Sequence, residues 1–187
     1  MKRFLLGMLM VVGVAALGLY VFNPSGTPSL DPRARIFGHI PYRLPATSME
    51  PTLLAGDYIV SSTFAYIKQS PQHGDIITFR YPRDPKQVYI KRVIGLPGDM
   101  IEVRGHQVFR NDIALDEPYV QHTHEREPAG KWQVPDSMYF VLGDNRDNSA
   151  DSRVWGFLPQ GLVEGKAIYV WVSKQGNTGS INAGVPR

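Results

Sequence analysis

The feature that most constrains this chain is a long uncharged stretch near its N-terminus. Phe4 to Phe22 is 19 residues without one charged side chain, and Lys2 and Arg3 come directly before it. As a helix it would extend roughly 28 Å, close to the hydrocarbon thickness of a bilayer. Residues 1–22 are therefore predicted to form a transmembrane anchor. Because basic residues stay on the cytoplasmic side, the N-terminus is expected in the cytoplasm and the remainder outside it.

The alternative for this stretch is a secretory signal peptide that is cleaved from the mature protein. The apolar run is longer than the usual core of a signal peptide. Its small residues Gly13, Ala15 and Ala16 lie inside the run instead of at its end, where a cleavage site would be. We therefore favour an uncleaved anchor.

The rest of the chain carries the pattern of a β protein. Residues 23–35 are rich in Pro, Gly and Ser and are predicted to be a linker. From Ile36-Phe37 onwards short β-branched or aromatic runs recur, with a predicted hairpin at Arg104–Gln107. Four of the runs border a pair typical of turns, namely Gly56-Asp57, Gly74-Asp75, Gly98-Asp99 and Gly143-Asp144. We predict a mostly β domain, of barrel or sandwich-like form, over residues 36–172.

Two segments depart from this pattern. Residues 111–136 are polar and contain three prolines, and we interpret them as a small excursion from the main sheet whose role stays open. Residues 173–187 are rich in Gly, Ser and Asn and are predicted to be a flexible tail.

Composition excludes several classes of function. A length of 187 residues suits one domain. The net charge is +3 and the basic residues are dispersed, which argues against a nucleic-acid partner. The absence of Cys excludes a thiol nucleophile and a cysteine-based metal site.

A serine held between two prolines is the first candidate for chemistry. Pro45 and Pro51 flank Ser48, and each fixes φ near about −65° and lacks an N–H. Residues 44–54 therefore cannot continue as a helix or as a central strand. They are predicted to form a shaped loop that presents one hydroxyl, and the alternative is an ordinary Pro-rich turn.

Two adjacent cations within a predicted strand are the second candidate. Side chains alternate along a strand, so Lys91 and Arg92 point to opposite faces and one of them must meet apolar surroundings. A desolvated lysine can lose its proton near neutral pH and then act as a general base. The alternative is a solvated lysine on an edge strand.

The third candidate is the polar segment Gly143–Arg153, which is either a solvated loop or a buried network of hydrogen bonds and ion pairs. A Ser-His-Asp triad is not indicated, because none of the five histidines lies in a recognisable triad motif. His122, His124 and Glu125 could bind a metal, but they lack a defined scaffold, so we predict no metal site and no cofactor.

Together these stretches resemble the type I (leader) signal peptidases of bacteria, the membrane proteases with a Ser/Lys dyad. Four motifs occur in the order of that family, and the resemblance runs from the anchor to about Trp171. The motifs are Ser48-Met49-x-Pro51-Thr52-Leu53, Gly74-Asp75-Ile76-Ile77-x-Phe79, Tyr89 to Asp99, and Gly143 to Pro159. The resemblance implies a mostly β catalytic domain of the signal-peptidase type, behind one N-terminal transmembrane helix.

Position by position, the resemblance also implies roles for individual residues. Ser48 matches the nucleophile, Lys91 the general base, and Ser149 the hydroxyl that orients the lysine amine. An ionic scaffold that holds the dyad is matched by Arg92, Asp144, Arg146, Asp151 and Arg153. Shallow pockets for the small residues before the cleavage point are matched by Tyr42, Leu44, Pro45, Met49, Leu53, Tyr89 and Ile90.

One position departs from the pattern of many members. They carry Ser or Thr two residues before the nucleophile, where a hydroxyl serves the oxyanion hole, and this chain has Ala46. The Ser48 N–H is therefore the expected main donor, with the Thr47 hydroxyl as the alternative.

The resemblance implies a monomeric endopeptidase in the bacterial inner membrane, with its catalytic domain outside the cytoplasm. It would remove signal peptides from exported preproteins after Ala-x-Ala sites, with signal peptides and membrane lipid as partners. Two other functions stay open at this point. One is a conjugative-transfer-type processing peptidase of the same superfamily, and the other is a non-catalytic, membrane-tethered binding domain.

Overall fold

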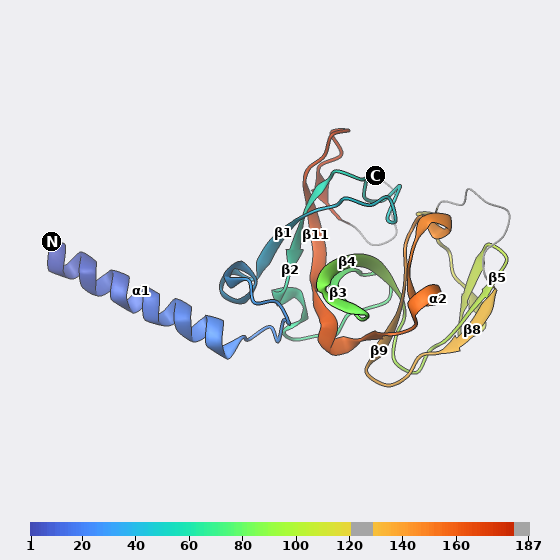
Figure 1. Ribbon diagram of the computed structural model, residues 1–187, viewed down its shortest axis with the longest axis horizontal. Coiled ribbons are helices and arrows are strands. Elements are labelled where there is room, and N and C mark those ends of the chain that lie inside the picture. The colour runs from blue at the N-terminus through green and yellow to red at the C-terminus, as the bar shows by residue number, and fades with distance from the viewer. Residues whose placement is uncertain (121–128, 182–187) are drawn as a thin grey trace.

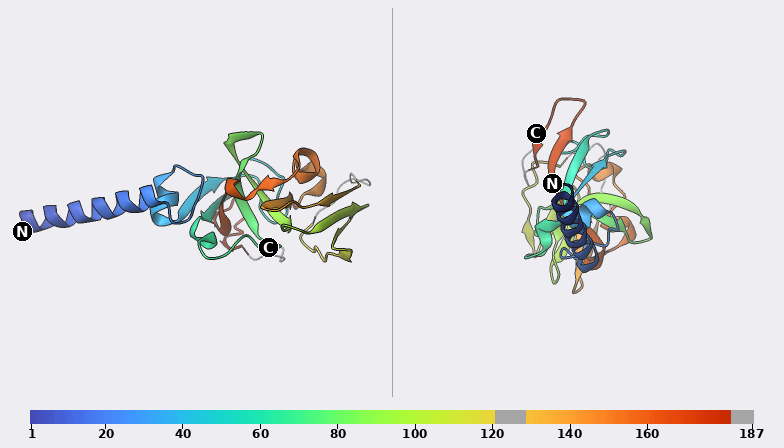
Figure 2. Two further views of the ribbon diagram at one scale, coloured as in Figure 1. Left: turned by 90° about the horizontal axis from the view of Figure 1, so that it is seen from below. Right: turned by 90° about the vertical axis from the view of Figure 1, so that its left-hand side faces the viewer.

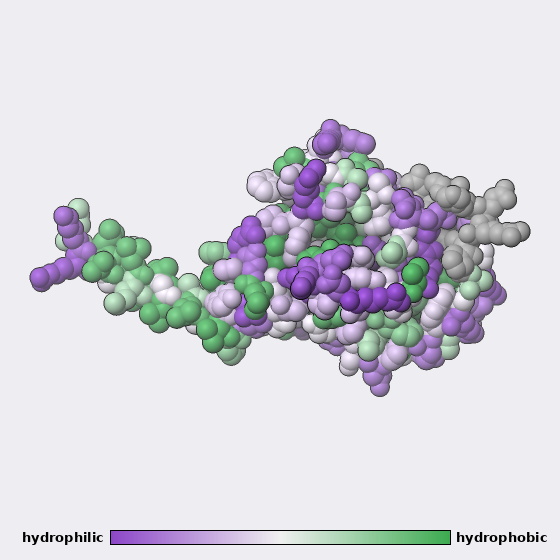
Figure 3. Space-filling view, viewed as in Figure 1, coloured by the Kyte–Doolittle hydropathy of each residue, from purple (hydrophilic) through white to green (hydrophobic). Residues whose placement is uncertain are grey.

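The computed structural model describes residues 1–120 and 129–181. Helix α1 (Lys2–Phe22) projects away from a β-rich body (Figures 1 and 2). None of its residues is buried, and its surface is hydrophobic except at the free end (Figure 3). Among the described residues, α1 is the one helix long and apolar enough to cross a membrane. This agrees with the predicted anchor.

The chain enters the body through a helical turn, not a strand. Arg33–Phe37 form a single π-helical turn, so the strand predicted at Ile36-Phe37 is wrong. The reason is local, because the Asp31 carboxylate accepts the Arg33 N–H at 2.8 Å and fixes the start of the turn. Gly38, at φ 72°, ends it. The first strand, β1 (His39–Arg43), follows directly.

Two antiparallel sheets make up the body. The larger has the order β1-β2-β11-β3-β4-β9-β10, with β12 paired to β11, and the smaller has the order β7-β6-β5-β8. The strands of the larger sheet after β1 are β2 (Tyr58–Ser62), β3 (Ile76–Tyr81), β4 (Asp84–Gly95), β9 (Met138–Leu142), β10 (Leu158–Pro159), β11 (Val163–Val172) and β12 (Gly179–Ser180). Those of the smaller are β5 (Met100–Arg104), β6 (Gln107–Arg110), β7 (Ile113–Ala114) and β8 (Gly130–Gln133).

The prediction of a mostly β fold is confirmed, although pairings among the described residues leave both sheets open and do not close a barrel. The predicted hairpin at Arg104–Gln107 joins β5 to β6. Helical elements after the entry turn are short, namely α2 (Ser152–Trp155) and the 3₁₀ turns at Phe64–Tyr66, Arg146–Asn148 and Gln160–Leu162.

Three hydrophobic clusters hold the sheets together. One lies beneath the Ser48 loop and is formed by Leu44, Met49, Leu53, Ile59, Ile76, Ala167 and Val170. A second, around Phe79 and Trp155, supports the centre of the larger sheet. The third joins the two sheets, because Ile101 and Val103 of β5 pack with Phe140 and Leu142 of β9. The small sheet is therefore part of the same hydrophobic body.

Three of the four Gly-Asp pairs form one kind of turn. Gly56, Gly74 and Gly98 have φ of 97°, 87° and 85°, which favours glycine. In each turn the Asp carboxylate accepts an N–H from three residues earlier, with donors Leu54, Gln72 and Leu96 at 3.0, 3.1 and 2.7 Å. The fourth pair, Gly143-Asp144, differs and belongs to the site described below.

The two segments that departed from the β pattern, residues 111–136 and 173–187, both contribute strands to the fold. β7 and β8 come from the predicted excursion and form the two edges of the small sheet. In the predicted tail, β12 pairs with β11, and Ile181 packs against the cluster beneath the Ser48 loop. The predicted tail therefore begins as part of the fold, and its residues 182–187 lie outside the described residues.

Gly165, on β11 beside the end of β2, gives a test of this packing. A Cβ at Gly165 would lie 2.5 Å from the Ser62 carbonyl oxygen, which is backbone and cannot swing away. We expect Gly165→Ala to lower the free energy of unfolding by about 1–3 kcal/mol, as overpacking does. Gly161→Ala is the control, because no atom of the described residues lies within 4 Å of where its Cβ would be. Equal effects of the two substitutions in urea denaturation would contradict the packing.

Candidate active site

The loop after β1 places Ser48 by hydrogen bonds at both of its ends. The Leu44 N–H donates to Asp57 O at 2.8 Å, and the Gly56 N–H donates to Leu44 O at 2.6 Å. The Asn145 N–H donates to Ser48 O at 3.2 Å, from a segment nearly a hundred residues further along the chain. The loop is therefore fixed by the tertiary fold and is not an ordinary Pro-rich turn.

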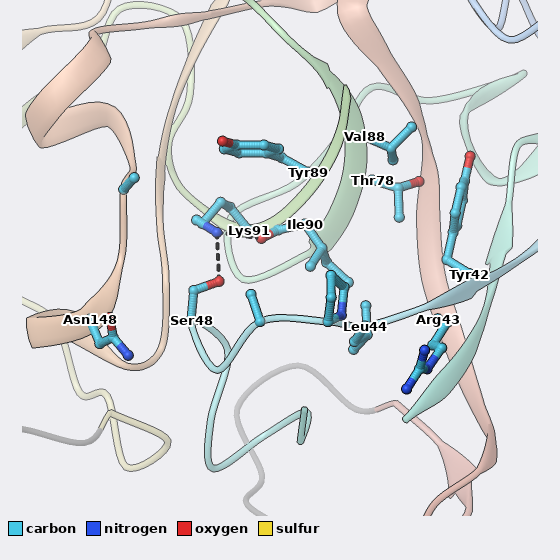
Figure 4. Close-up of a pocket in the computed structure, with 13 residues that line it drawn as sticks. Tyr42, Arg43, Leu44, Ser48, Thr78, Val88, Tyr89, Ile90, Lys91 and Asn148 are labelled. Carbon is cyan, nitrogen blue, oxygen red and sulfur yellow. Dashed lines mark hydrogen bonds between the residues drawn. The ribbon is translucent and has the colours of Figure 1, made fainter. Parts of the chain in front are cut away.

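Lys91 lies in the interior of the sheet. β4 pairs with β3 on one side and β9 on the other, so the alternative of an edge strand is wrong. The residue is only 4% exposed. Its Nζ donates to Ser48 Oγ at 2.8 Å and to Ile90 O at 2.8 Å, and Figure 4 shows the amine pointing at the serine hydroxyl.

Burial lowers the pKa of Lys91 from 10.5 to about 8, because the charged amine loses its water. Asp151 and Asp144 act in the opposite direction but do not outweigh this desolvation. Part of the apolar cover is the Tyr89 ring, whose centroid lies 5.6 Å from Nζ. Tyr89 is itself held by parallel stacking on Tyr81 at 4.4 Å. Near neutral pH the amine is thus partly neutral and able to accept a proton.

Arg92 is also buried, so both faces of this strand bury a cation, whereas the alternation pattern required only one. Arg92 is 0% exposed and forms a two-pronged ion pair with Asp144, at 2.9 and 2.6 Å. Thr52 donates its hydroxyl to the same carboxylate at 2.5 Å. This ion pair therefore joins the lysine strand to the serine loop.

A second ion pair lies within the segment Gly143–Arg153. Arg153 donates Nε and Nη2 to the Asp151 carboxylate, each at 2.9 Å, and Nη2 also to Arg146 O at 2.5 Å. The Gly143 N–H donates to Asp151 Oδ2 at 3.1 Å, and Arg146 Nε donates to Gly143 O at 3.1 Å. All five residues of the expected ionic scaffold are thus brought together, in the buried network that was one of the two alternatives for this segment.

Gly143 is the point where this network touches the serine loop. A Cβ at Gly143 would lie 2.4 Å from Ser48 O and 2.3 Å from Ser149 Oγ. Its φ is not positive, so glycine is required here for close approach and not for a turn. Ser149 Oγ is buried and has no hydrogen-bond partner in the described part of the chain. The bond expected from Ser149 to the lysine amine is not formed in this structure and stays a prediction.

A cavity of about 290 Å³ opens beside the Ser48–Lys91 pair (Figure 4). Six of the residues predicted for substrate pockets or the oxyanion position line it, namely Tyr42, Leu44, Pro45, Ala46, Tyr89 and Ile90. Met49 and Leu53 do not line it, because they are 1% and 0% exposed in the core beneath. The sequence analysis missed five lining residues, namely Arg43, Thr78, Val88, Asn148 and Ala150.

The wall of the cavity at Tyr42 is held by the buried carboxylate of Glu164, a residue that lies outside the four sequence motifs. The Tyr42 hydroxyl donates to Glu164 Oε2, and Arg80 Nε lies 2.6 Å from Glu164 Oε1. Glu164 is 2% exposed. Thr78, at the same end of the cavity in Figure 4, exchanges a hydrogen bond with Ser61 at 2.7 Å. These contacts limit the movement of the wall.

The neighbourhood of Ala46 shows which oxyanion donors are available. Ala46 lines the cavity with a methyl group and offers no side-chain donor. Among the described residues, the Ser48 N–H makes no hydrogen bond and is free to donate. The Thr47 hydroxyl accepts from Asn148 Nδ2 at 2.8 Å and does not line the cavity. The geometry favours the backbone N–H of Ser48 over Thr47.

The described residues contain no cluster of three or more acidic or histidine side chains that could hold a metal ion. His122, His124 and Glu125, the metal candidates of the sequence, lie outside the described residues.

A serine hydroxyl bonded to a buried lysine amine, beside an apolar cavity in a β-rich domain, is the arrangement of the serine hydrolases that use lysine as their base. The family model described as "Signal peptidase, peptidase S26" matches residues 6–172. The chain belongs to this family. As in other members of this membrane-anchored family, an apolar helix precedes the catalytic domain.

Two sequence relatives agree with this assignment. A signal peptidase I from Pseudomonas fluorescens is 36% identical, and the match covers 71% of this chain and 64% of the relative. A probable signal peptidase I-1 from Synechocystis is 42% identical over 78% of this chain and 79% of the relative. A signal peptidase I structure from Enterococcus faecalis is 38% identical and covers 52% of this chain and 97% of its own, with a TM-score of 0.48.

The ion pair between Arg92 and Asp144 gives a test of the scaffold. Asp144→Asn keeps the shape but leaves the buried guanidinium without its carboxylate, so we expect the free energy of unfolding to fall by about 3–5 kcal/mol. The control is Glu102→Gln, whose partners Arg104 and Lys131 are 55% and 53% exposed, and we expect a loss below about 1 kcal/mol. Urea denaturation of the full chain in detergent measures both. A loss below about 1 kcal/mol for Asp144→Asn would contradict the scaffold role.

Proposed function

We propose that the protein is a membrane-bound serine endopeptidase that removes signal peptides from exported preproteins, with Ser48 as nucleophile and Lys91 as general base. One observation carries this proposal. The buried amine of Lys91, whose pKa is lowered to about 8, lies 2.8 Å from the Ser48 hydroxyl at the edge of a substrate-sized cavity.

Acylation follows from this geometry. With Lys91 neutral, the serine hydroxyl donates its proton to Nζ while Oγ attacks the carbonyl carbon of the peptide bond. The negative charge that develops on the carbonyl oxygen is stabilised by the Ser48 N–H, because that donor makes no hydrogen bond among the described residues and its loop is fixed at both ends. Lys91 then gives its proton to the leaving amine. The signal peptide stays as an ester on Ser48 and the mature protein departs.

Deacylation uses the same base. Lys91 Nζ, neutral again, takes a proton from a water molecule whose oxygen attacks the ester carbonyl. A second oxyanion forms and collapses, and the proton on Lys91 returns to Ser48 Oγ as the acid leaves. Ser149 is proposed to orient the amine through its hydroxyl in this cycle, since its buried Oγ has no competing partner among the described residues.

The cavity supports a preference for small side chains before the cleaved bond. Its lining includes the apolar residues Leu44, Pro45 and Ile90, and Leu44 and Ile90 also pack into the cluster beneath the loop. An Ala-x-Ala sequence in extended form places two methyl groups on the same face. We propose that the peptide lies beside β4 and the loop after β1, adding its backbone to theirs.

The proposed location is the bacterial inner membrane, with one span. α1 has Lys2 and Arg3 at its start, which supports a cytoplasmic N-terminus by the positive-inside rule. The catalytic domain would then lie on the outer side of that membrane, where the cleavage regions of signal peptides emerge. Its proposed partners are those peptides and the membrane lipid, and the enzyme is proposed to act as a monomer.

Cleavage assays with two single variants test the dyad. We expect Ser48→Ala and Lys91→Ala each to abolish processing of several different preproteins by the full chain in detergent, because either change removes a member of the dyad. The matched control is Lys166→Ala on β11, which removes a lysine that is 32% exposed, pairs with Asp75 and does not line the cavity. Processing that survives in either dyad variant would refute the mechanism.

The same assay separates the alternative functions. Cleavage of one dedicated substrate alone would favour a conjugative-transfer-type peptidase. Binding of preproteins by the wild type without any cleavage would favour a tethered binding domain.

The lowered pKa of Lys91 predicts how activity depends on pH. The base must be neutral, so kcat/KM should be high above about pH 8 and fall about tenfold per pH unit well below it. Activity falls at low pH because Lys91 is protonated below its pKa and can then no longer accept the serine proton. Initial rates at limiting substrate measure this profile. A profile that is flat across the pKa of Lys91 would contradict its role as base.

A further inference from the structure

The segment between β7 and β8 was left without a role by the sequence, and its described part folds back onto the catalytic scaffold. Leu115 is held to the small sheet, because its N–H donates to Val108 O at 2.9 Å and its carbonyl accepts from Gln107 Nε2 at 2.7 Å. The next residues leave that sheet. Glu117 and Tyr119 then reach residues of the dyad's ionic scaffold.

Glu117 binds Arg146. Glu117 Oε1 accepts from Arg146 Nη2 at 2.6 Å, and the two side chains are only 7% and 1% exposed. Tyr119 donates its hydroxyl to the same oxygen at 3.0 Å. The carboxylate thus receives two donors in a place with little water, where charge-assisted hydrogen bonds are strongest.

Tyr119 also covers Arg92. The guanidinium carbon of Arg92 lies 3.7 Å from the centre of the Tyr119 ring, and Tyr119 is 4% exposed. Arg92 is the partner of Asp144 and the sequence neighbour of Lys91. Burial raises the pKa of the Tyr119 hydroxyl, so it remains a hydrogen-bond donor throughout the working pH range. One short segment therefore contacts two of the three arginines of the ionic scaffold.

A continuous path leads from Glu117 to the nucleophile. Glu117 holds Nη2 of Arg146, and Nε of the same guanidinium donates to Gly143 O at 3.1 Å. Because the guanidinium is planar and rigid, fixing one of its edges fixes the other. Gly143 in turn lies against Ser48 O and Ser149 Oγ, close enough that no Cβ fits between them.

We propose that Glu117 and Tyr119 are positioning residues for the Ser48–Lys91 dyad, acting through Arg146 and Arg92. The small sheet then has a catalytic purpose, because it carries the segment that completes the scaffold from outside the main sheet. The inference rests on the proposed peptidase function.

The test uses the full chain in detergent and a fluorogenic peptide with an Ala-x-Ala site. Glu117→Gln keeps the shape but weakens the hold on Arg146. We expect kcat, normalised to sites titrated with a serine-directed acylating probe, to fall at least about tenfold, since small displacements of reacting groups have large effects on rate. KM should stay within about twofold, because neither residue lines the cavity. Normalisation removes the effect of partial unfolding, which would lower the number of titrated sites instead.

Three further variants complete the design. Glu102→Gln, which removes a carboxylate on the same small sheet whose side chain is 22% exposed, should leave kcat unchanged. Tyr119→Phe keeps the ring over Arg92 and removes only the bond to Glu117, so it should lower kcat by a smaller factor and decides the matter if Glu117→Gln does not fold. In a double-mutant cycle, Glu117→Gln should lower kcat no further once Arg146→Met is present.

The outcomes that would overturn the inference are distinct from failure of the proposed function. A normalised kcat within about twofold of wild type for a folded Glu117→Gln, or an unchanged kcat for Tyr119→Phe, refutes the positioning role. Independent, multiplying losses in the double mutant refute the route through Arg146. A wild type that cleaves no peptide refutes the proposed function itself.

Discussion

The burial of the Lys91 amine beside Ser48 is the interaction on which the rest of the site depends. A charged lysine in the interior is costly, so the fold must either pair it with a carboxylate or favour its neutral form. The two nearby carboxylates are committed elsewhere, Asp144 to Arg92 and Asp151 to Arg153. Within the described part of the chain the amine is left with a hydroxyl and a carbonyl as partners, and its pKa falls because desolvation outweighs the attraction of Asp151 and Asp144.

The ionic scaffold is needed because the Lys91 amine is buried without a carboxylate partner of its own. A base without an ionic partner has no strong interaction of its own to fix it, so its position has to come from its surroundings. Arg92, the neighbour of Lys91 on β4, is fixed by its ion pair with Asp144. The same carboxylate accepts a hydrogen bond from Thr52 of the serine loop. Positive and negative charges are thus abundant around the dyad but are paired with one another. These ion pairs fix the positions of the catalytic side chains, whereas the reactivity of the site comes from the Lys91 amine, which has no ion-pair partner among the described residues.

The fourth motif of the chain, Gly143 to Pro159, contacts both the serine loop, through Asn145, and the lysine strand, through the ion pair of Asp144 with Arg92. Gly143 places a bare backbone against the serine loop, and the Asn145 N–H donates to the Ser48 carbonyl. The small sheet adds a further layer through Glu117 and Tyr119. Segments that are far apart in the sequence therefore converge on one hydroxyl.

Sequence alone determined what depends on local chemistry. The span of α1 follows from an uncharged run, and the turns at Gly56, Gly74 and Gly98 follow from glycine's conformational freedom. The pairing of Ser48 with Lys91 was implied only by the resemblance of their motifs to a known family, because the residues alone left a Pro-rich turn and a solvated lysine open. Only the tertiary structure decided that both Lys91 and Arg92 are buried, that Met49 and Leu53 support the cavity instead of lining it, and that Glu117 reaches Arg146. Burial and ion pairing between distant segments depend on how sheets pack, and that information is spread over the whole chain instead of residing in any one stretch.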